Sequence, residues 1–518
     1  MPNRSTDTLF QLIRSLEKSE KRNFKLYIKR NSAKEDLKII QLFDALDKLT
    51  DYDEKLLLKK MPTVEKPQLA NLKTHLYKQL LASLRLLRST ESIDLQLNEQ
   101  MDYARILYNK GLHLQSLKIL DKARELARAS HKFNFMVQVL SLEKKIETLH
   151  ITRSLQGKSE QLAAESLEVV AHISTVSRMS NLAVQLYSWY IQNGHARNEK
   201  DEAVIKEFFK KNLPPNAESY TGFYERLYLY QSYVWYAFIR QDFLMYYRYS
   251  KKWVEIFDTQ QMMISVETGH FIKGMHNLLN AHFDLRNFRE FENTLHRFER
   301  FAMSTQANRH DNFRIHTFIY MNSARINQHL MMGTFSEGLK AVPSMVNQLE
   351  EYALYVDNHR ILVFNYKIAS LYFGAGDYGT CIDFLQKIIN GHVDLRTDLQ
   401  CYARLMHLMA HYEMGNTDIM EYLTKSVYRF MSKMQNLRGV EEEMFKFIRL
   451  SFHISPQKLK PALEQFLNTI KKFEKNRFET RAFAYLDIIS WVEGKVYGKT
   501  MGEVIKQKYL QSKKRKKA

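Results

Sequence analysis

The sequence predicts an all-α protein built mainly as an array of helical hairpins. Glycine and proline are scarce, with 17 Gly and 8 Pro among 518 residues, too few for the many turns of a β protein. Leu, Lys, Glu, Gln, Met and Arg, which lose little side-chain freedom in helices, recur along the whole chain. An apolar content of 45% indicates a chain that folds around a core.

Residues 1–89 are expected to form a separate, basic helical head. Pro62 and Pro67 separate its last helix from the segment before it. Apolar residues recur at spacings of three and four, which is typical of helices with one buried face. The three stripes are Leu9, Leu12, Ile13 and Leu16; Phe24 and Ile28; and Leu69, Leu72, Leu76, Leu80, Leu84 and Leu87.

Residues 90–505 carry a repeated helix, turn and helix. The clearest copy is the segment 368–378, which continues into a second amphipathic pattern, and a related copy lies at 103–123. Similar turns place Phe243, Phe288, Phe335 and Thr417 at the position of Tyr378, with spacings of 39 to 47 residues. This spacing predicts eight or nine hairpins between Asn98 and about Phe473. The segment 212–216, with two prolines, is expected to form a bend.

Two of these copies resemble the tetratricopeptide repeat family. The matching residues are Ala369, Tyr372, Gly376, Tyr378 and Cys381 in one copy and Ala104, Leu107, Gly111, His113 and Ser116 in the other. The repeat here is nearer 43 residues long, whereas the family's is about 34, and Tyr246 and Phe291 replace a small residue in two copies. The resemblance implies a superhelical, solenoid-like array whose first helices line a concave surface for protein or peptide ligands.

The net charge of +20 is concentrated at the two ends of the chain. Residues 1–30 hold 8 basic and 3 acidic side chains, and residues 506–518 hold 7 basic and no acidic ones. The second segment lacks an apolar stripe, so we expect 506–518 to be a disordered polybasic tail. Nucleic acid or another polyanion is therefore a possible partner.

Aromatic and basic residues interleave between Tyr220 and Trp253. Such a mixture can grip a peptide or stack on bases, although contacts between helices also use aromatic side chains. The residues expected to line a partner-binding groove are Tyr228, Tyr233, Trp235, Tyr236, Arg240, Tyr246, Tyr247, Arg248 and Trp253.

A second candidate surface consists of basic side chains in the head and tail. Lys18, Arg22, Lys25 and Lys29 recur at steps of three and four, so a helix would present them as one ridge toward phosphates. A solvated helix face has the same pattern. The tail adds the phosphate-contact candidates Lys513, Lys514, Arg515, Lys516 and Lys517.

No motif predicts an enzyme, a cofactor or a metal site. The glycines of Gly374-x-Gly376-x-x-Gly379 have dinucleotide-binding spacing, but they join two helices where that fold requires a strand and a helix. His407 and His411 share a helix face without a companion ligand.

The sequence therefore predicts a non-enzymatic scaffold or adaptor that binds a protein or peptide along the array. The alternative is a nucleic-acid-binding or regulatory protein that uses the basic head and tail. The longest stretch without Asp, Glu, Lys or Arg, residues 179–196, has 18 residues and includes several polar side chains, whereas a membrane span needs about 20 predominantly apolar residues. Free cysteines at 381 and 401 and the absence of a secretory pattern lead us to expect a cytoplasmic protein.

Overall fold

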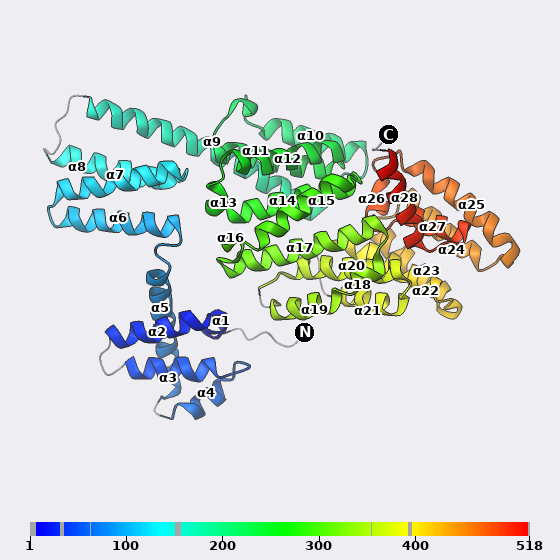
Figure 1. Cartoon of the computed structure of the whole chain (residues 1–518), viewed down its shortest axis with the longest axis horizontal. Helices are drawn as coiled ribbons and strands as arrows, with labels where there is room; N and C mark the ends of the chain where they lie inside the picture. The colour runs from blue at the N-terminus through cyan, green and yellow to red at the C-terminus, as the bar shows by residue number, and fades with distance from the viewer. Residues whose placement is uncertain are drawn as a thin grey trace. The chain divides into compact units, whose positions relative to one another are not determined.

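The computed structural model describes residues 7–31, 36–62, 64–150, 157–353, 355–391 and 396–515 (Figure 1). Within these residues every regular element is a helix, which confirms the predicted all-α class. The most extensive contacts join helices that are consecutive in the chain, so the protein is a helical array. It forms two compact units, Met1–Ile173 and Ser174–Ala518, which divide inside α9 (Lys158–Asn193). No helix in the described part of the chain is long and apolar enough to cross a membrane.

Unit 1 consists of a head of short helices followed by longer helices that pack in sequence. Its helices are α1 (Thr8–Ser15), α2 (Lys18–Asn31), α3 (Asp36–Asp47), α4 (Glu54–Lys60), α5 (Lys66–Leu87), α6 (Ile93–Asn109), α7 (His113–Ala129) and α8 (Phe133–Leu149). The head has its own core, which includes the fully buried Leu76 and the rings of Phe24 and Phe43, 5.0 Å apart. A second core forms between α6, α7, α8 and the start of α9.

The α6–α7 hairpin shows why the repeat copy at 103–123 has small residues at two positions and a glycine in its turn. Ala104 and Ser116 are both fully buried, and the Ser116 hydroxyl donates a hydrogen bond to the carbonyl oxygen of Ala104 at 2.8 Å. Small residues at these two positions let the helices approach closely. Gly111, in the turn between them, has a φ of 76°, a conformation that glycine adopts without strain.

Unit 2 contains the rest of the array. Its remaining helices are α10 (Glu199–Asn212), the 3₁₀ helix η1 (Ala217–Ser219), α11 (Phe223–Ile239), α12 (Phe243–Thr259), α13 (Met263–Val266), α14 (Thr268–Asp284), α15 (Phe288–Ala302), α16 (Thr305–Asn308), α17 (Asp311–Met332), α18 (Phe335–Leu339), α19 (Val342–Glu351), α20 (Asn358–Ala375), α21 (Tyr378–Ile389), α22 (Thr397–Glu413), α23 (Thr417–Lys433), α24 (Gly439–Ser451), α25 (Pro456–Phe473), α26 (Thr480–Tyr485), α27 (Ile488–Tyr497) and α28 (Met501–Arg515).

The repeat positions predicted from the sequence mark the starts of helices. Each of the five reference residues is the first residue of α12, α15, α18, α21 or α23. The residue two positions earlier has a left-handed backbone in every case: Gln241, Arg286, Gly333, Gly376 and Gly415, with φ between 51° and 84°. This single left-handed residue reverses the chain direction and allows the second helix to pack against the first.

The regular spacing fails between α8 and α11. Three repeat lengths were expected between His113 and Phe243, but α9 is one helix of 36 residues. The expected bend at 212–216 is a loop inside unit 2, where Asn216 has a φ of 56°. The two compact units divide earlier, within α9.

The helices of unit 2 fold back so that early and late segments meet. The Arg197 guanidinium donates a hydrogen bond to the side-chain oxygen of Gln435 at 2.8 Å. Glu202 of α10 forms ion pairs both with Arg240 and with Arg477, which lies before α26. These contacts join the beginning of unit 2 to its last third.

The predicted disordered tail is wrong for residues 506–515, which belong to α28. Val504, Ile505 and Tyr509 are buried against earlier helices, and the rings of Tyr509 and Phe288 lie 4.8 Å apart. α28 packs on α17, α20 and α27 (Figure 1). This apolar stripe is hard to recognise in the sequence because basic residues interrupt it. Residues 516–518 lie outside the described residues.

Candidate functional site

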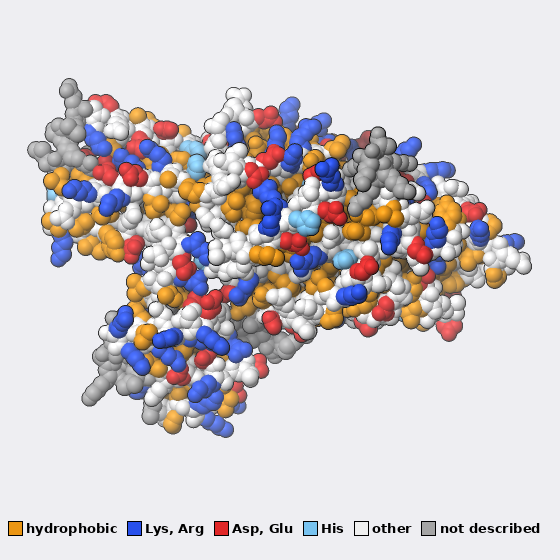
Figure 2. Space-filling view, in the orientation of Figure 1, with side chains coloured by type: hydrophobic (Ala, Val, Ile, Leu, Met, Phe, Trp, Pro, Cys, Tyr) orange, Lys and Arg blue, Asp and Glu red, His pale blue; other side chains and the backbone are white. Residues whose placement is uncertain are grey.

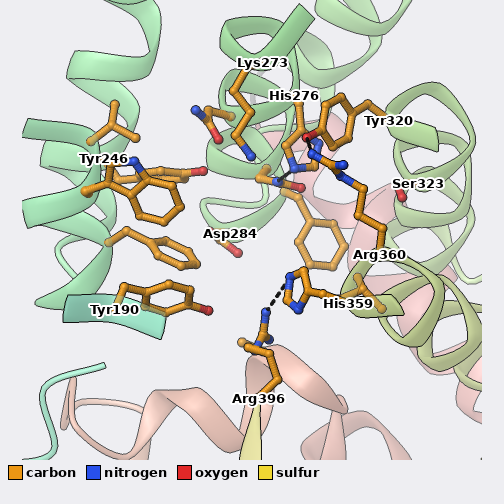
Figure 3. A pocket seen from close by; sticks show the side chains of 18 of the residues that line it. Tyr190, Tyr246, Lys273, His276, Asp284, Tyr320, Ser323, His359, Arg360 and Arg396 are labelled. Atoms are coloured by element: carbon orange, nitrogen blue, oxygen red, sulfur yellow. Dashed lines mark hydrogen bonds between the residues drawn. The ribbon is translucent and has the colours of Figure 1, made fainter. Parts of the chain in front are cut away.

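Unit 2 contains a cavity of about 890 Å³ (Figure 3). Its walls come mainly from α9, α11, α14, α17 and α20, with α12, α26 and Arg396 completing them. Each long helix contributes one stripe at a spacing of three and four residues. Lys273, His276, Asn277 and Asn280 form the stripe of α14.

One side of the cavity is aromatic. Tyr190 from α9 lies 5.6 Å from Trp235 and 5.2 Å from Phe238, measured between ring centroids, and Phe238 lies 5.3 Å from Tyr246. Figure 3 shows Tyr190 and Tyr246 on the same side of the cavity. These contacts place an apolar wall beside the space that a ligand would occupy.

The opposite side is polar and positively charged. Figure 3 shows His276, Tyr320, His359 and Arg360 facing the aromatic wall across the cavity. The His276 ring stacks on Tyr320 at 4.1 Å, and the ammonium of Lys273 lies 5.2 Å from the centroid of the Tyr320 ring. Burial lowers the pKa of His276 well below its usual value, and the nearby cations lower it further, so this imidazole is neutral at pH 7.

Tyr320 reports the electrostatic character of this wall. Burial alone would raise the pKa of its hydroxyl, but Lys273 and Arg360 outweigh that effect and lower it. A place where a buried phenol is easier to ionise is a place that stabilises negative charge.

Arg396 closes the lower end of the cavity. Its guanidinium forms an ion pair with Asp398 at 2.9 Å and donates to the Tyr485 hydroxyl at 3.0 Å. A third contact, 3.5 Å long, reaches a ring nitrogen of His359. Burial lowers the pKa of His359 to about 4, and Arg396 adds to this effect, so the neutral ring accepts the hydrogen bond.

A chain of polar side chains connects three helices behind the cationic wall. Lys367 of α20 donates to Asn327 of α17, whose amide nitrogen donates to Asn280 of α14 at 3.3 Å. Asn280 in turn contacts His276 at 3.0 Å. This chain fixes the side chains that face the cavity.

Lys367 and Asp284 are both partly buried and line the cavity. Burial accordingly lowers the pKa of Lys367 to about 8, and the charge of Asp284 limits the fall. Burial raises the pKa of Asp284 to about 7, with Arg286 and Lys367 opposing the rise. Shifted titratable groups beside a cavity are typical of functional sites.

The cavity carries more positive charge than its carboxylates neutralise. Arg360 pairs with Asp357 at 2.6 Å, and Arg396 pairs with Asp398. Among the described residues no carboxylate oxygen lies within 4.0 Å of the ammonium groups of Lys273 and Lys367.

Asn277 adds an unused hydrogen-bond donor. Its side chain is 5% exposed and lines the cavity, and its amide nitrogen has no acceptor within the described part of the chain. Leaving a buried donor unsatisfied costs free energy, which a ligand that accepts from it would recover. The cavity is therefore suited to an anionic group that also accepts a hydrogen bond.

The predicted aromatic groove is only partly at this site. Trp235 and Tyr246 line the cavity. Tyr236 is instead buried against the ring of Phe209 at 4.1 Å, and Trp253 fills the core beside Gly274, so neither can face a partner.

The other predicted groove residues also lie away from the cavity. Arg240 is held by Glu202 at 2.7 Å, and Tyr233 stacks on Tyr249 at 4.0 Å. The remaining ones, also outside the cavity lining, are Tyr228, Tyr247 and the exposed Arg248. Helix packing thus explains most of the aromatic cluster.

The predicted basic ridge of α2 is interrupted. Lys25 is half-buried and pairs with Asp44 at 2.6 Å, whereas Lys18, Arg22 and Lys29 are exposed. Figure 2 shows basic side chains mixed with acidic ones over the head. Lys513, Lys514 and Arg515 belong to α28, but their side chains, like all of Lys516 and Lys517, lie outside the described residues.

Other candidate centres gain no support. His407 and His411 contact each other with ring centroids 4.6 Å apart, and the described residues contain no group of three metal-ligating side chains. Cys381 and Cys401 are buried free thiols. The Gly374–Gly376 segment joins helix α20 to helix α21, as expected for a repeat turn.

Compared with protein-family models and with curated protein sequences, the chain shows no match. The site therefore rests on its own geometry. Six residues of the cavity were not predicted from the sequence: Lys273, His276, Tyr320, Arg360, Lys367 and Arg396. A polar stripe at a spacing of three and four along otherwise apolar helices is the signal that could have identified most of them.

Proposed function

We propose that this chain is a non-enzymatic binding protein that holds a compact group of a partner protein or peptide inside unit 2. The observation that carries the proposal is the cavity itself, built from one inner stripe of each of several consecutive hairpins. In this proposal the array is a tetratricopeptide-like superhelix that surrounds its ligand.

The size of the cavity supports a compact ligand. Ligand pockets usually measure roughly 300–1,000 Å³, and this cavity measures about 890 Å³. An extended peptide advances about 3.3 Å per residue, so a few residues or one large side chain would fit. A long helix, roughly 10–12 Å across with its side chains, would not.

The hydrogen bonds of the cavity support binding over catalysis. His276 and His359 are the histidines of the cationic wall, and each is already held by a neighbouring side chain. A catalytic site needs a nucleophile or base aimed at a reacting atom. The described side chains instead form a rigid, preorganised lining.

The test is a selection of short random peptides on the full chain, followed by binding to two variants. Ser323 lines the cavity and is 5% exposed, so Ser323→Phe should fill part of the space. Ser432 is exposed on α23, and Ser432→Phe is the matched control. We expect selected peptides to lose at least about tenfold in affinity to the first variant only. Melting curves verify that both variants fold, and equal binding to both would refute the proposal.

A second candidate function, nucleic-acid binding, rests on α2. Lys18, Arg22 and Lys29 are exposed and have no ion-pair partner among the described residues. Anisotropy titrations of a labelled DNA duplex in increasing salt would test it. Replacing all three residues by glutamine should reduce the slope of log affinity against log salt by about 0.9 for each phosphate that the protein no longer neutralises. An unchanged slope would exclude this surface.

A further inference from the structure

We infer that the cavity of unit 2 binds a phosphate monoester attached to an aromatic ring. The inference rests on the proposed function, because it names the chemistry of the group that enters the cavity. Two observations lead to it: the uncompensated positive charge on one wall and the aromatic wall that faces it.

The charge balance favours a dianion. Four cations line the cavity, and carboxylates pair with two of them, Arg360 and Arg396. Asp284, which also lines the cavity and has a pKa of about 7, offsets part of the charge of Lys367. Lys273 and Lys367 remain without a carboxylate partner among the described residues. A phosphate monoester carries a charge of about −1.5 to −2 at pH 7, whereas a carboxylate carries one negative charge.

The cations of this wall converge on one place although they come from different helices. Lys273 from α14 and Arg360 from α20 both lie over the Tyr320 ring, at 5.2 and 5.9 Å. Lys367 reaches the same wall through Asn327 and Asn280, whose partner His276 stacks on Tyr320. Cations that meet from separate helices can surround the oxygens of a phosphate group.

Asn277 provides the second, independent sign of a ligand. Its side chain is more than nine-tenths buried and follows Lys273 by one helical turn. Its amide nitrogen lacks an acceptor within the described residues and has less than 1 Å² of accessible surface. A turn of the side chain toward the cavity that it lines would bring this donor to a phosphate oxygen next to Lys273.

The aromatic wall determines what the phosphate is attached to. Tyr190, Trp235 and Tyr246 present ring surface to the cavity, and the Lys273 ammonium and the Arg396 guanidinium lie 5.9 Å from the Trp235 ring and 5.8 Å from the Tyr190 ring, measured to the centroids. An aliphatic or fully polar ligand would leave the remaining ring surface against water. A ring on the ligand would stack there or pack edge to face.

The experiment is calorimetric titration of the full chain with phenyl phosphate and three matched probes. Benzoate keeps the ring but carries one charge, benzyl alcohol is neutral, and inorganic phosphate has no ring. We expect phenyl phosphate to bind at least about tenfold more tightly than each of them. Equal affinity for phenyl phosphate and benzoate, or for phenyl phosphate and inorganic phosphate, would overturn the inference.

Substitutions at two lysines test whether phenyl phosphate binds inside the cavity. Lys273→Met and Lys367→Met should each weaken phenyl phosphate binding by about tenfold, while Lys251→Met, at an exposed position of α12, should not. Both substitutions in the cavity replace a cation by an uncharged chain of similar length, so folding should survive. If neither changes the affinity, the phosphate binds elsewhere and the inference is wrong.

Two larger probes distinguish the source of the group. A phosphotyrosine pentapeptide that binds more tightly than adenosine monophosphate would support a partner protein as the source. The opposite order would overturn both the partner in the proposed function and the direct attachment of the phosphate to a ring, because adenosine monophosphate carries its phosphate on the ribose. Conversely, peptides that need the cavity but carry no ring phosphate would sustain the proposed function and overturn this inference.

Discussion

The cations of α2 and the cations of the cavity are the same residue types in opposite surroundings. Lys18, Arg22 and Lys29 follow one another along a single helix and project into water. Lys273 and Lys367 come from helices far apart in the sequence and face an enclosed space. Charges in water are screened within about 8–10 Å, whereas charges in an enclosed, less polar site interact strongly.

This difference shows that a regular run of charge is a weaker sign of function than charges that converge. The α2 pattern is easy to read in a sequence, but the structure pairs Lys25 with Asp44 and leaves the others solvated. The cavity cations are spread over several helices, and only the packing of those helices shows that they line one space. There, no carboxylate among the described residues forms an ion pair with Lys273 or Lys367, and Asp284 offsets part of the charge of Lys367 without contacting it directly.

The removal of α28 should have the largest effect, because it should destabilise the cavity and leave the helix α2 of the head intact. α28 packs on α17 and α20, which carry Tyr320, Arg360 and Lys367. A chain that ends at Lys499 loses the buried side chains of Val504, Ile505 and Tyr509. We expect unit 2 to lose about 5 kcal/mol of stability, at roughly 1.5–3 kcal/mol per buried side chain. Phenyl phosphate binding should disappear with it.

The readout is amide hydrogen exchange, which reports the two regions separately. The amides of α2 should keep their protection, because the head has its own core. A chain that ends at Gln511 is the control and should match the full chain within about 0.5 kcal/mol. If the longer deletion leaves exchange in α17 and α20 unchanged, α28 does not support the cavity.

A smaller effect on stability is expected when a methyl group is added at Gly333, which packs against α28. Gly333 has a φ of 69°, and a Cβ there would overlap the carbonyl oxygen of Gly502. Gly415 has the same φ, but a Cβ would meet open space. We expect Gly333→Ala to cost about 3 kcal/mol in urea unfolding, since overpacking adds to backbone strain, and Gly415→Ala about 1 kcal/mol. Equal losses of stability in the two variants would mean that α28 shifts to accommodate the added methyl group at little cost in free energy.

Much of the fold could be predicted because the repeat turns have a local cause. The residues Phe243, Phe288 and Tyr378 were identified from the sequence, and each begins a helix two positions after a left-handed residue. The long α9 was missed because a helix without interruption leaves no turn to detect. α28 was missed because its apolar residues, Val504, Ile505 and Tyr509, are few among the basic ones.

Part of the site was also within reach of the sequence. Trp235, Asn280 and Asn327 each lie eight residues before the start of the second helix of their hairpin, and all three line the cavity. Equivalent repeat positions share a face, so the inner face could have been read from the repeat register. Arg396 and Tyr485 lie outside that register. They reach the cavity only because unit 2 folds back on itself, which no local pattern encodes.

The smallest predicted effect is the pH dependence of anion binding by the cavity. Between pH 9 and pH 7, Lys367, with a pKa of about 8, gains its charge, and Asp284, with a pKa of about 7, begins to lose its own. Both changes favour an anion, and a phosphate monoester stays largely dianionic because its second pKa is about 6.

We therefore expect the affinity for phenyl phosphate to rise by about tenfold from pH 9 to pH 7, which corresponds to roughly 1.4 kcal/mol. The cavity's other titratable groups do not reverse the sign: burial and nearby cations keep His276 neutral, and Arg360 remains charged. Lys273 and Arg360 lower the pKa of Tyr320, and any ionisation of this phenol toward pH 9 acts in the same direction. In Lys367→Met most of the slope should vanish, while Lys251→Met should retain it. A wild-type affinity that is flat between pH 7 and pH 9 would show that Lys367 does not contact the bound anion, and the cavity would then differ less from α2 than its geometry indicates.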